Sequence, residues 1–166
     1  MTSNDSKQKL QEKIGEALGL EMAAQKAVEE LGSKGLLDKG GMKAKLENMR
    51  KQASNHQSDL EELMQKLSES AGLDSSHIQE VPNETEQKAS EMMKTYLGEN
   101  PDSSEAIEFL CLAEGGEVTH YEVLSTMAAK KVKDRQFSSG VNSILREERR
   151  HLQLCTRLAK QLAAAQ

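Results

Sequence analysis

Two short motifs in this sequence pair a carboxylate with an imidazole. Glu117 is followed three residues later by His120, and Glu148 is followed three residues later by His151. In an α-helix, residues three apart lie on the same face, so each pair can direct an oxygen and a nitrogen ligand toward one point. Carboxylate oxygen with imidazole nitrogen suits iron or manganese, and zinc is also compatible. The two motifs therefore predict a metal site, provided that both lie on helices.

Both motifs lie within stretches whose apolar residues recur at helical spacing. Four long amphipathic helices are predicted, at about 8–31, 42–68, 104–132 and from 138 or 139 to the end. Glu21 interrupts the apolar face of the first helix, and His56 interrupts that of the second. A lone charge at such a position is costly to bury, whereas a cation would compensate for the lost hydration. We therefore expect one metal site in a helical core, formed by Glu21, His56, Glu117, His120, Glu148 and His151.

The apolar faces of the four helices differ in how clearly the sequence defines them. The first comprises Leu10, Ile14, Leu18, Glu21, Ala24, Val28 and Leu31. The second comprises Leu46, Met49, Ala53, His56, Leu60, Leu63 and Leu67. The fourth comprises Val141, Ile144, Glu148, His151 with Leu152, Cys155, Leu158 and Leu162. In the third helix the face is ambiguous, because either Ala113 or Glu114, and both His120 and Tyr121, fit the spacing.

The connections between these helices predict how they are arranged. The first and second helices are joined by a short connection, as are the third and fourth, so each pair forms an antiparallel hairpin. About 35 residues join the two hairpins, enough to travel back along the bundle. They comprise a polar loop at 69–83 and a short helix at about 84–97. Two helical hairpins joined by one long crossover form the ferritin-like topology. We therefore expect an all-α four-helix bundle with one short extra helix, in a single domain spanning 1–166 with residues 1–6 disordered.

Composition agrees with a helical protein and excludes several other classes. Aromatic residues make up only 2% of the chain, and good helix formers dominate, which excludes a β-sandwich or β-barrel. The net charge is −5 and the basic residues are scattered, which argues against nucleic acid as a partner. No apolar run is long enough for a membrane span, and no secretory signal is present. With only two cysteines, the chain is expected to be a reduced cytoplasmic protein.

Local similarities connect the chain with a known superfamily. They lie in Leu20-Glu21 through Leu31, in His56-Gln-Ser-Asp-Leu-Glu-Glu-Leu, in His120-Tyr121-Glu122 and in Glu147-Glu148-Arg-Arg-His151. The chain resembles the ferritin-like superfamily, most closely the small bacterial stress proteins of the YciE/YciF type. Rubrerythrin and bacterioferritin share the wider pattern. The resemblance implies a homodimer that binds iron or manganese and reacts with oxygen or peroxide in stress protection or iron handling, with ferroxidase-like or peroxidase-like activity.

The resemblance also implies a set of ligands, one of which is missing. The family pattern has one Glu on the first helix, Glu-x-x-His on the second, one Glu on the third and Glu-x-x-His on the fourth. Glu21 and His56 match the first two helices, and Glu148 with His151 matches the fourth. Ala53 stands where the Glu of the second helix is expected.

The absence of a carboxylate at Ala53 leaves three outcomes open, because that group normally bridges two metals. His120 compensates as an additional ligand, the site holds one metal, or metal binding has been lost. On the third helix, Glu117 is the predicted ligand, with Glu114 and Glu122 as alternatives in register. We expect the second metal to bind weakly or not at all.

Two adjacent glycines, Gly115 and Gly116, lie inside the third helix. Each costs a helix ~1 kcal/mol relative to Ala. They predict either a close approach of two helices or a π-bulge beside the site, and the alternative is a kink without chemical consequence.

Two functions are compatible with these patterns. The first is a ferritin-like metalloprotein. The second is a non-catalytic helical interaction protein that has lost the metal site and whose buried polar groups set register or partner choice. The metal content of the purified protein distinguishes them.

Overall fold

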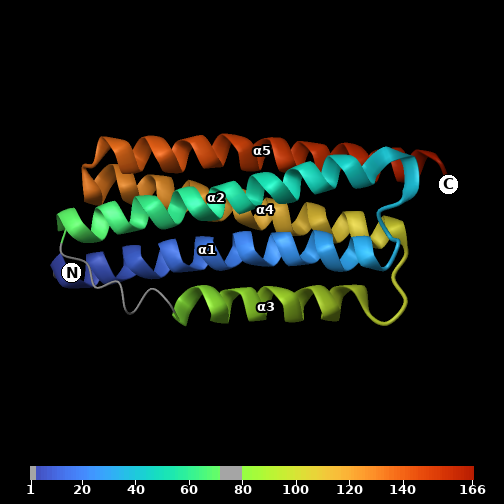
Figure 1. Ribbon diagram of the computed structural model, residues 1–166, viewed down its shortest axis with the longest axis horizontal. Helices are drawn as coiled ribbons and strands as arrows, with labels where there is room; N and C mark the ends of the chain where they lie inside the picture. Colours follow the sequence, from blue (N-terminus) through green and yellow to red (C-terminus); the bar gives the residue numbers. More distant parts are fainter. Residues whose placement is uncertain (1–2, 72–79) are drawn as a thin grey trace.

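The computed structural model describes residues 3–71 and 80–166, and these residues are almost entirely helical (Figure 1). The elements are α1 Ser3–Ser33, η1 Lys39–Gly41, α2 Met42–Ala71, α3 Glu80–Leu97, α4 Ser103–Met127, the π-helical turn η2 Ala128–Val132, and α5 Arg135–Ala164. No strand occurs within the described ranges. The predicted all-α fold is therefore confirmed.

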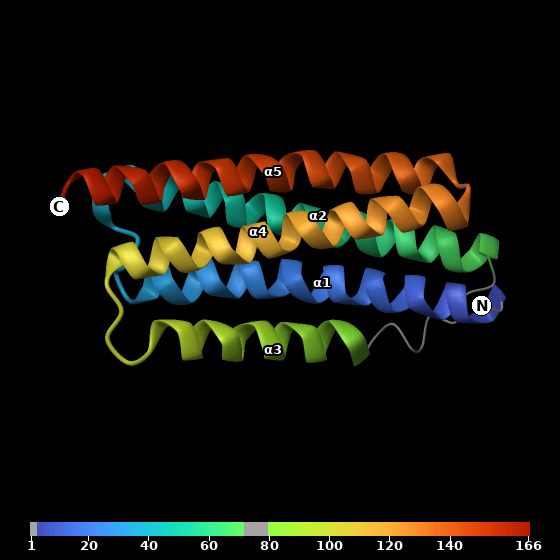
Figure 2. The same cartoon turned by 180° about the vertical axis from the view of Figure 1, so that it is seen from behind.

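Four helices form the bundle, and the fifth lies outside it. α1 and α2 form one antiparallel hairpin, and α4 and α5 form the other (Figure 1). The long connection between α2 and α4 carries α3, which packs along α1 and much less on α4 (Figure 2). The predicted hairpins and the crossover with its extra helix are thus present.

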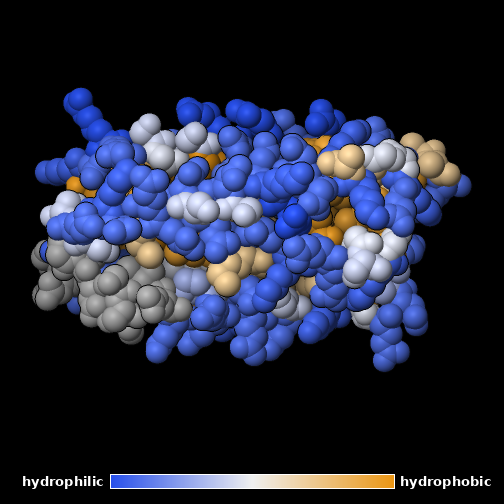
Figure 3. Space-filling view, viewed as in Figure 1, coloured by the Kyte–Doolittle hydropathy of each residue, from blue (hydrophilic) through white to orange (hydrophobic). Residues whose placement is uncertain are grey.

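The core consists of two apolar clusters, one toward each end of the bundle. One contains Val28, Leu31, Leu46, Met49, Ile107, Leu110 and Leu158. The other contains Leu10, Ile14, Leu18, Leu60, Tyr121, Leu124, Val141 and Ile144. On the face of the molecule seen in Figure 3, the surface is mostly hydrophilic, with apolar side chains visible only in places. Between the two clusters, each bundle helix contributes buried polar residues to a separate layer of the core.

Several helix ends differ from the predicted ones. α1 begins at Ser3 rather than near residue 8, because its polar first turn carries Asp5, whose charge favours a helix N-terminus. Residues 3–6, for which the sequence predicts disorder, belong to α1 in the structure, while 1–2 lie outside the described residues. Residues 69–71 and 80–83 of the predicted loop 69–83 are helical, since α2 continues to Ala71 and α3 begins at Glu80. The rest of that loop, 72–79, also lies outside the described residues.

Side-chain caps define the starts of α4 and α5. The Asp102 carboxylate accepts a hydrogen bond from the Glu105 amide, and the Glu105 carboxylate accepts one from the Asp102 amide, both at 2.9 Å. This capping box confirms the predicted start near residue 104. α5 begins earlier than predicted, because Asp134 accepts hydrogen bonds from the amides of Gln136 and Phe137 and so caps the helix at Arg135.

Glycines on α1 allow α3 to pack closely against it. A Cβ atom on Gly19 would lie 2.5 Å from the Pro82 carbonyl oxygen and 2.6 Å from Thr85 Cβ. A Cβ atom on Gly15 would lie 2.9 Å from the side chain of Val81. Because both glycines face α3, the backbones of α1 and α3 approach more closely than side chains on both helices would permit.

By contrast, Gly115 and Gly116 on α4 do not serve close packing. A Cβ atom at either position would meet nothing within 4 Å. The helix is α-helical through both residues, and the π-helical turn lies farther along the chain at Ala128–Val132. The predictions of a close helix approach and of a π-bulge at these glycines are therefore wrong.

The two kinds of glycine predict opposite effects on stability. Gly19→Ala is expected to lower the free energy of unfolding by about 1–3 kcal/mol, because the new methyl group forces α3 away from α1. Gly115→Ala is expected to raise it by about 0.5–1 kcal/mol, because Ala restricts the unfolded chain and meets no clash in α4. Urea denaturation followed by circular dichroism measures both. Equal effects of the two substitutions would contradict the assigned packing of α3.

Candidate metal centre

Six ionisable side chains form one polar layer between the two apolar clusters. They are Glu21 of α1, His56 of α2, Glu114 and Glu117 of α4, and Glu148 and His151 of α5, each at most 4% exposed. Ligand atoms from these helices form two groups, Glu21 with His56 and Glu148, and Glu114 with Glu148 and His151. Within each group the ligand atoms lie within 4.8 Å of one another, and Glu148 belongs to both.

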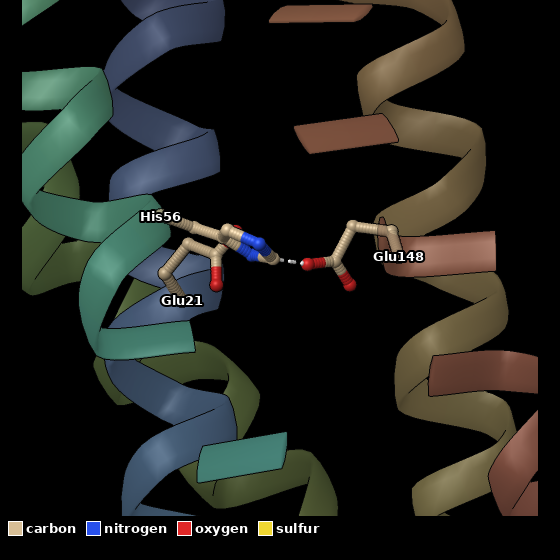
Figure 4. Close-up of side chains that lie close together, drawn as sticks. All are labelled: Glu21, His56 and Glu148. Atoms are coloured by element: carbon tan, nitrogen blue, oxygen red, sulfur yellow. Dashed lines mark ion pairs between the residues drawn. The ribbon is translucent and has the colours of Figure 1, made fainter. Parts of the chain in front are cut away.

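The first half of the centre lies around the imidazole of His56 (Figure 4). Its Nδ1 atom lies 2.7 Å from Oε1 of Glu148 and 3.4 Å from Oε1 of Glu21. Its other nitrogen, Nε2, donates a hydrogen bond to Glu147 at 2.8 Å. In the neutral imidazole this bond places the proton on Nε2 and leaves the Nδ1 lone pair facing the carboxylates. Glu21 is held in turn by the Tyr121 hydroxyl, which donates to its Oε1 at 2.6 Å.

The second half repeats this arrangement around His151. The Nδ1 atom of His151 lies 3.5 Å from Oε2 of Glu114 and 3.5 Å from Oε2 of Glu148. Its Nε2 donates a hydrogen bond to the Gln52 side-chain oxygen at 2.9 Å. The rings of His56 and His151 are stacked, with centroids 5.5 Å apart. Glu148 thus presents one oxygen to each imidazole.

Several polar atoms of the layer have no hydrogen bond among the described residues. They are Oε2 of Glu21, Nδ1 of His56, Oε2 of Glu114, and both carboxylate oxygens of Glu148. Although His56 Nδ1 and Glu148 Oε1 are close, they are not aligned as donor and acceptor. Buried polar atoms in this state are costly, and a cation would satisfy them. The donor set therefore fits a metal ion.

Burial and mutual repulsion favour the protonated form of three carboxyl groups. Burial, and next the nearby charge of Glu148, raise the pKa of Glu21 to about 7. Burial, and also the charge of Glu148, raise the pKa of Glu114 to about 8, against the opposing effect of His151. Burial and the carboxylates of Glu148, Glu114 and Glu21 raise the pKa of Glu117 well above its usual value. Without a cation, these groups therefore retain protons near neutral pH.

Glu148 is the exception, because two imidazoles face it. Burial opposes its ionisation, but the adjacent imidazoles of His151 and His56 outweigh burial and lower the pKa of Glu148 to about 2. Burial likewise opposes protonation of the imidazoles, yet the neighbouring carboxylates raise the pKa of His56 to about 11 and that of His151 to about 9. The metal-free centre is thus a carboxylate between two imidazolium groups.

Five of the six predicted residues lie in this layer, and His120 does not. The Nε2 atom of His120 donates to the Lys13 carbonyl oxygen at 3.1 Å and lies 3.5 Å from a carboxylate oxygen of Glu16. The buried face of α4 passes through Glu114, Glu117 and Tyr121. His120 directly precedes Tyr121 in the helix and therefore points away from this face. The proposed alternative Glu122 is exposed and pairs with Arg149 at 2.9 Å.

The sequence left Glu114 as an alternative to Glu117, and the structure places both in the centre. The supporting contacts of Gln52, Glu147 and Tyr121 had not been predicted. A signal for Tyr121 was present, because it follows Glu117 by four residues on the same face. Gln52 and Glu147 carry no such signal, because each lies beside the buried face of its helix and not on it. Their roles depend on which imidazole of another helix lies within hydrogen-bond distance.

Comparison with models of protein families, with curated proteins and with solved structures found no match. Within the described residues, no helix has the length and apolar character that a membrane crossing requires. The contacts and charges of the polar layer are therefore the basis for assigning a function.

Proposed function

We propose that this protein is a ferritin-like metalloprotein that holds two ions of iron or manganese in the polar layer. The observation that carries the proposal is the position of Glu148, whose two oxygens face the Nδ1 atoms of His56 and His151. Each half also has its own second carboxylate, Glu21 or Glu114. This arrangement supplies each of two ions with an imidazole, a carboxylate that only that ion contacts, and a carboxylate that both ions share.

Glu117 supports binding of a second ion despite the absence of a carboxylate at Ala53. Its side chain is buried, and the charges of Glu148, Glu114 and Glu21 all act on it, so it lies beside both halves. With neutral imidazoles, four ionised carboxylates balance the charge of two divalent cations, which relieves the cost of burying either set alone. We therefore infer that α4 provides the group that α2 lacks.

Three residues beside the layer hold these ligands in place. Glu147 and Gln52 fix the orientation of the two imidazoles, and Tyr121 fixes Glu21. The apolar clusters on both sides limit access of water. Bound iron would supply electrons for the reduction of dioxygen or peroxide. Together with the resemblance described above, this favours a role in oxidative stress or iron handling, as a ferroxidase-like or peroxidase-like homodimer in the cytoplasm.

Metal content provides the direct test. Protein prepared under reducing conditions is expected to bind two Fe²⁺ ions per chain in an anaerobic titration, and elemental analysis of purified protein should identify the native metal. If iron, manganese and zinc all fail to bind, the ionic network of the layer is structural. The protein would then fit the second candidate, a non-catalytic helical interaction protein.

Metal affinity is expected to rise with pH. In the metal-free protein, the pKa values of His56, His151 and Glu114 are about 11, 9 and 8, so these groups carry protons near neutrality. A cation must displace those protons, because only the deprotonated groups bind metal. Titration with Mn²⁺ between about pH 6 and pH 8 should show tighter binding at higher pH, with proton release measured by a pH indicator. Binding independent of pH, without proton release, would contradict these ligands.

A further inference from the structure

A groove of about 810 Å³ lies between α1, α3 and α4. The three helices are seen together in Figure 2. The groove exists because small side chains face one another while α3 and α4 do not close over them. Its lining includes Ala23, Ala24 and Ala27 of α1, Ala89 of α3, and Ala113 and Gly116 of α4. This volume is typical of sites for small molecules.

The position of α3 keeps the groove open. α3 is fixed to α1 through Gly15 and Gly19, and through an ion pair between Lys26 and Glu86 at 2.8 Å. Toward α4, the Tyr96 and Phe109 rings meet with their centroids 5.7 Å apart and bound one end of the groove.

Glu117 connects the groove to the metal centre. This carboxylate is only 3% exposed, belongs to the polar layer and also lines the groove. Gly116, next to it, leaves open space where a side chain would otherwise project. A molecule in the groove would therefore lie directly beside a group of the centre.

We propose that the groove binds a small, uncharged aliphatic molecule as the substrate of the metal centre, with one end of the molecule at Glu117. This inference rests on the proposed function for the role of substrate. The apolar lining favours an aliphatic body, because burying a charged group against apolar side chains is costly. A second protein surface is a poorer occupant, because Glu117 is almost wholly buried and a flat surface would not reach it.

The two glycines of α4 provide a matched pair of variants. In Gly116→Leu, the new side chain fills the groove. In Gly115→Leu, the same side chain is added one residue away, at a position that does not line the groove. Neither Cβ atom clashes, so both variants should fold. A titration with 1-decanol is followed through the NMR signals of the Met92 and Met93 methyl groups, which lie at the groove.

Saturable shifts of these methyl signals are expected in the native protein. Gly116→Leu should weaken the binding of 1-decanol about tenfold or more, and Gly115→Leu should leave it unchanged. Absence of saturable binding, or equal effects of the two variants, would overturn the proposal. So would a dimer in solution that covers Met92 and Tyr96 and excludes the alcohol.

A second measurement separates this proposal from the metal proposal. The titration is done on metal-free protein and on protein loaded with Co²⁺, whose visible absorption reports on its ligands. A change of that absorption on addition of 1-decanol supports placement beside the centre, and binding without any change overturns the role as substrate. Failure of Co²⁺ to bind, with 1-decanol still bound, would count against the metal centre and hence against the role as substrate, while the groove remains a binding site.

Discussion

Glu148→Gln is expected to abolish tight metal binding and to destabilise the metal-free protein by about 3–5 kcal/mol. Gln keeps the shape of the side chain but removes its charge. Both groups of candidate ligand atoms include Glu148, so neither keeps its full set in the variant. In the metal-free protein, the imidazolium groups of His56 and His151 lose the carboxylate that lies between them. Among the described residues, no other carboxylate forms an ion pair with both imidazoles.

The pH dependence of this loss follows from the pKa shifts. The raised pKa values of His56 and His151 contribute stability that is full below their ordinary value near 6.5 and is lost as pH rises through about 9 and 11. The lowered pKa of Glu148 contributes stability that is lost as pH falls from about 4.5 through about 2. The difference between native protein and variant should therefore be largest between pH 4.5 and 6.5 and should shrink above pH 9.

Denaturation with urea in the presence of a chelator, at several pH values, measures this difference, and elemental analysis measures metal binding. Glu147→Gln is the matched control. Glu147 is 35% exposed and pairs with Nε2 of His56, the nitrogen that faces away from Glu148. Its loss should reduce metal affinity about 10–100-fold with little effect on stability. If Glu148→Gln were no more harmful than this control, Glu148 would not be the shared ligand.

The second large effect is expected at Glu117, as a change in the number of bound metals. Two divalent cations in neighbouring half-sites repel each other, and carboxylates between them offset the repulsion. Since Ala53 contributes no carboxylate, Glu117→Gln should leave three carboxylates in the centre. The number of tightly bound ions should therefore fall from two to one. The fold should be retained, because Gln matches Glu in size and a neutral group replaces one whose raised pKa already favours its protonated form.

A second substitution tests whether a carboxylate on α2 can replace that of Glu117 in binding the second ion. Ala53 lies three residues before His56 and shares its buried face on α2. Adding Ala53→Glu to Glu117→Gln should therefore restore the second ion, which anaerobic Fe²⁺ titration would detect. Glu122→Gln, at an exposed residue paired with Arg149, is the control and should change nothing. If Glu117→Gln still bound two ions tightly, another group would be neutralising the pair.

Much of the fold could be predicted because local patterns determine it. The positions predicted for the apolar face of the first helix are all buried, from Leu10 to Leu31. Burial of Glu21, His56, Glu148 and His151 could be predicted in the same way, since each replaces an apolar residue at regular spacing. The start of α4 was likewise encoded locally, by the capping box of Asp102 and Glu105.

The ligands on α4 could not be decided from the same patterns. Successive residues of a helix are separated by about 100°, so the spacing alone allowed either His120 or Tyr121 to face inward. The structure places Tyr121 against Glu21 and turns His120 toward Lys13. The same rotation brings Glu114 and Glu117 into the centre together, which the sequence had presented as alternatives.

The sequence by itself determined which helices form and which face of α1, α2 and α5 is buried, because both depend on residues within a few turns of one another. Tertiary structure alone decided that α3 lies on α1, that Glu148 faces both imidazoles, and that a groove leads to Glu117. Each of these depends on residues far apart in the chain. Gly19 contacts another helix only because Pro82 packs on it, and Glu148 lies between two imidazoles only because His56 reaches it from another helix.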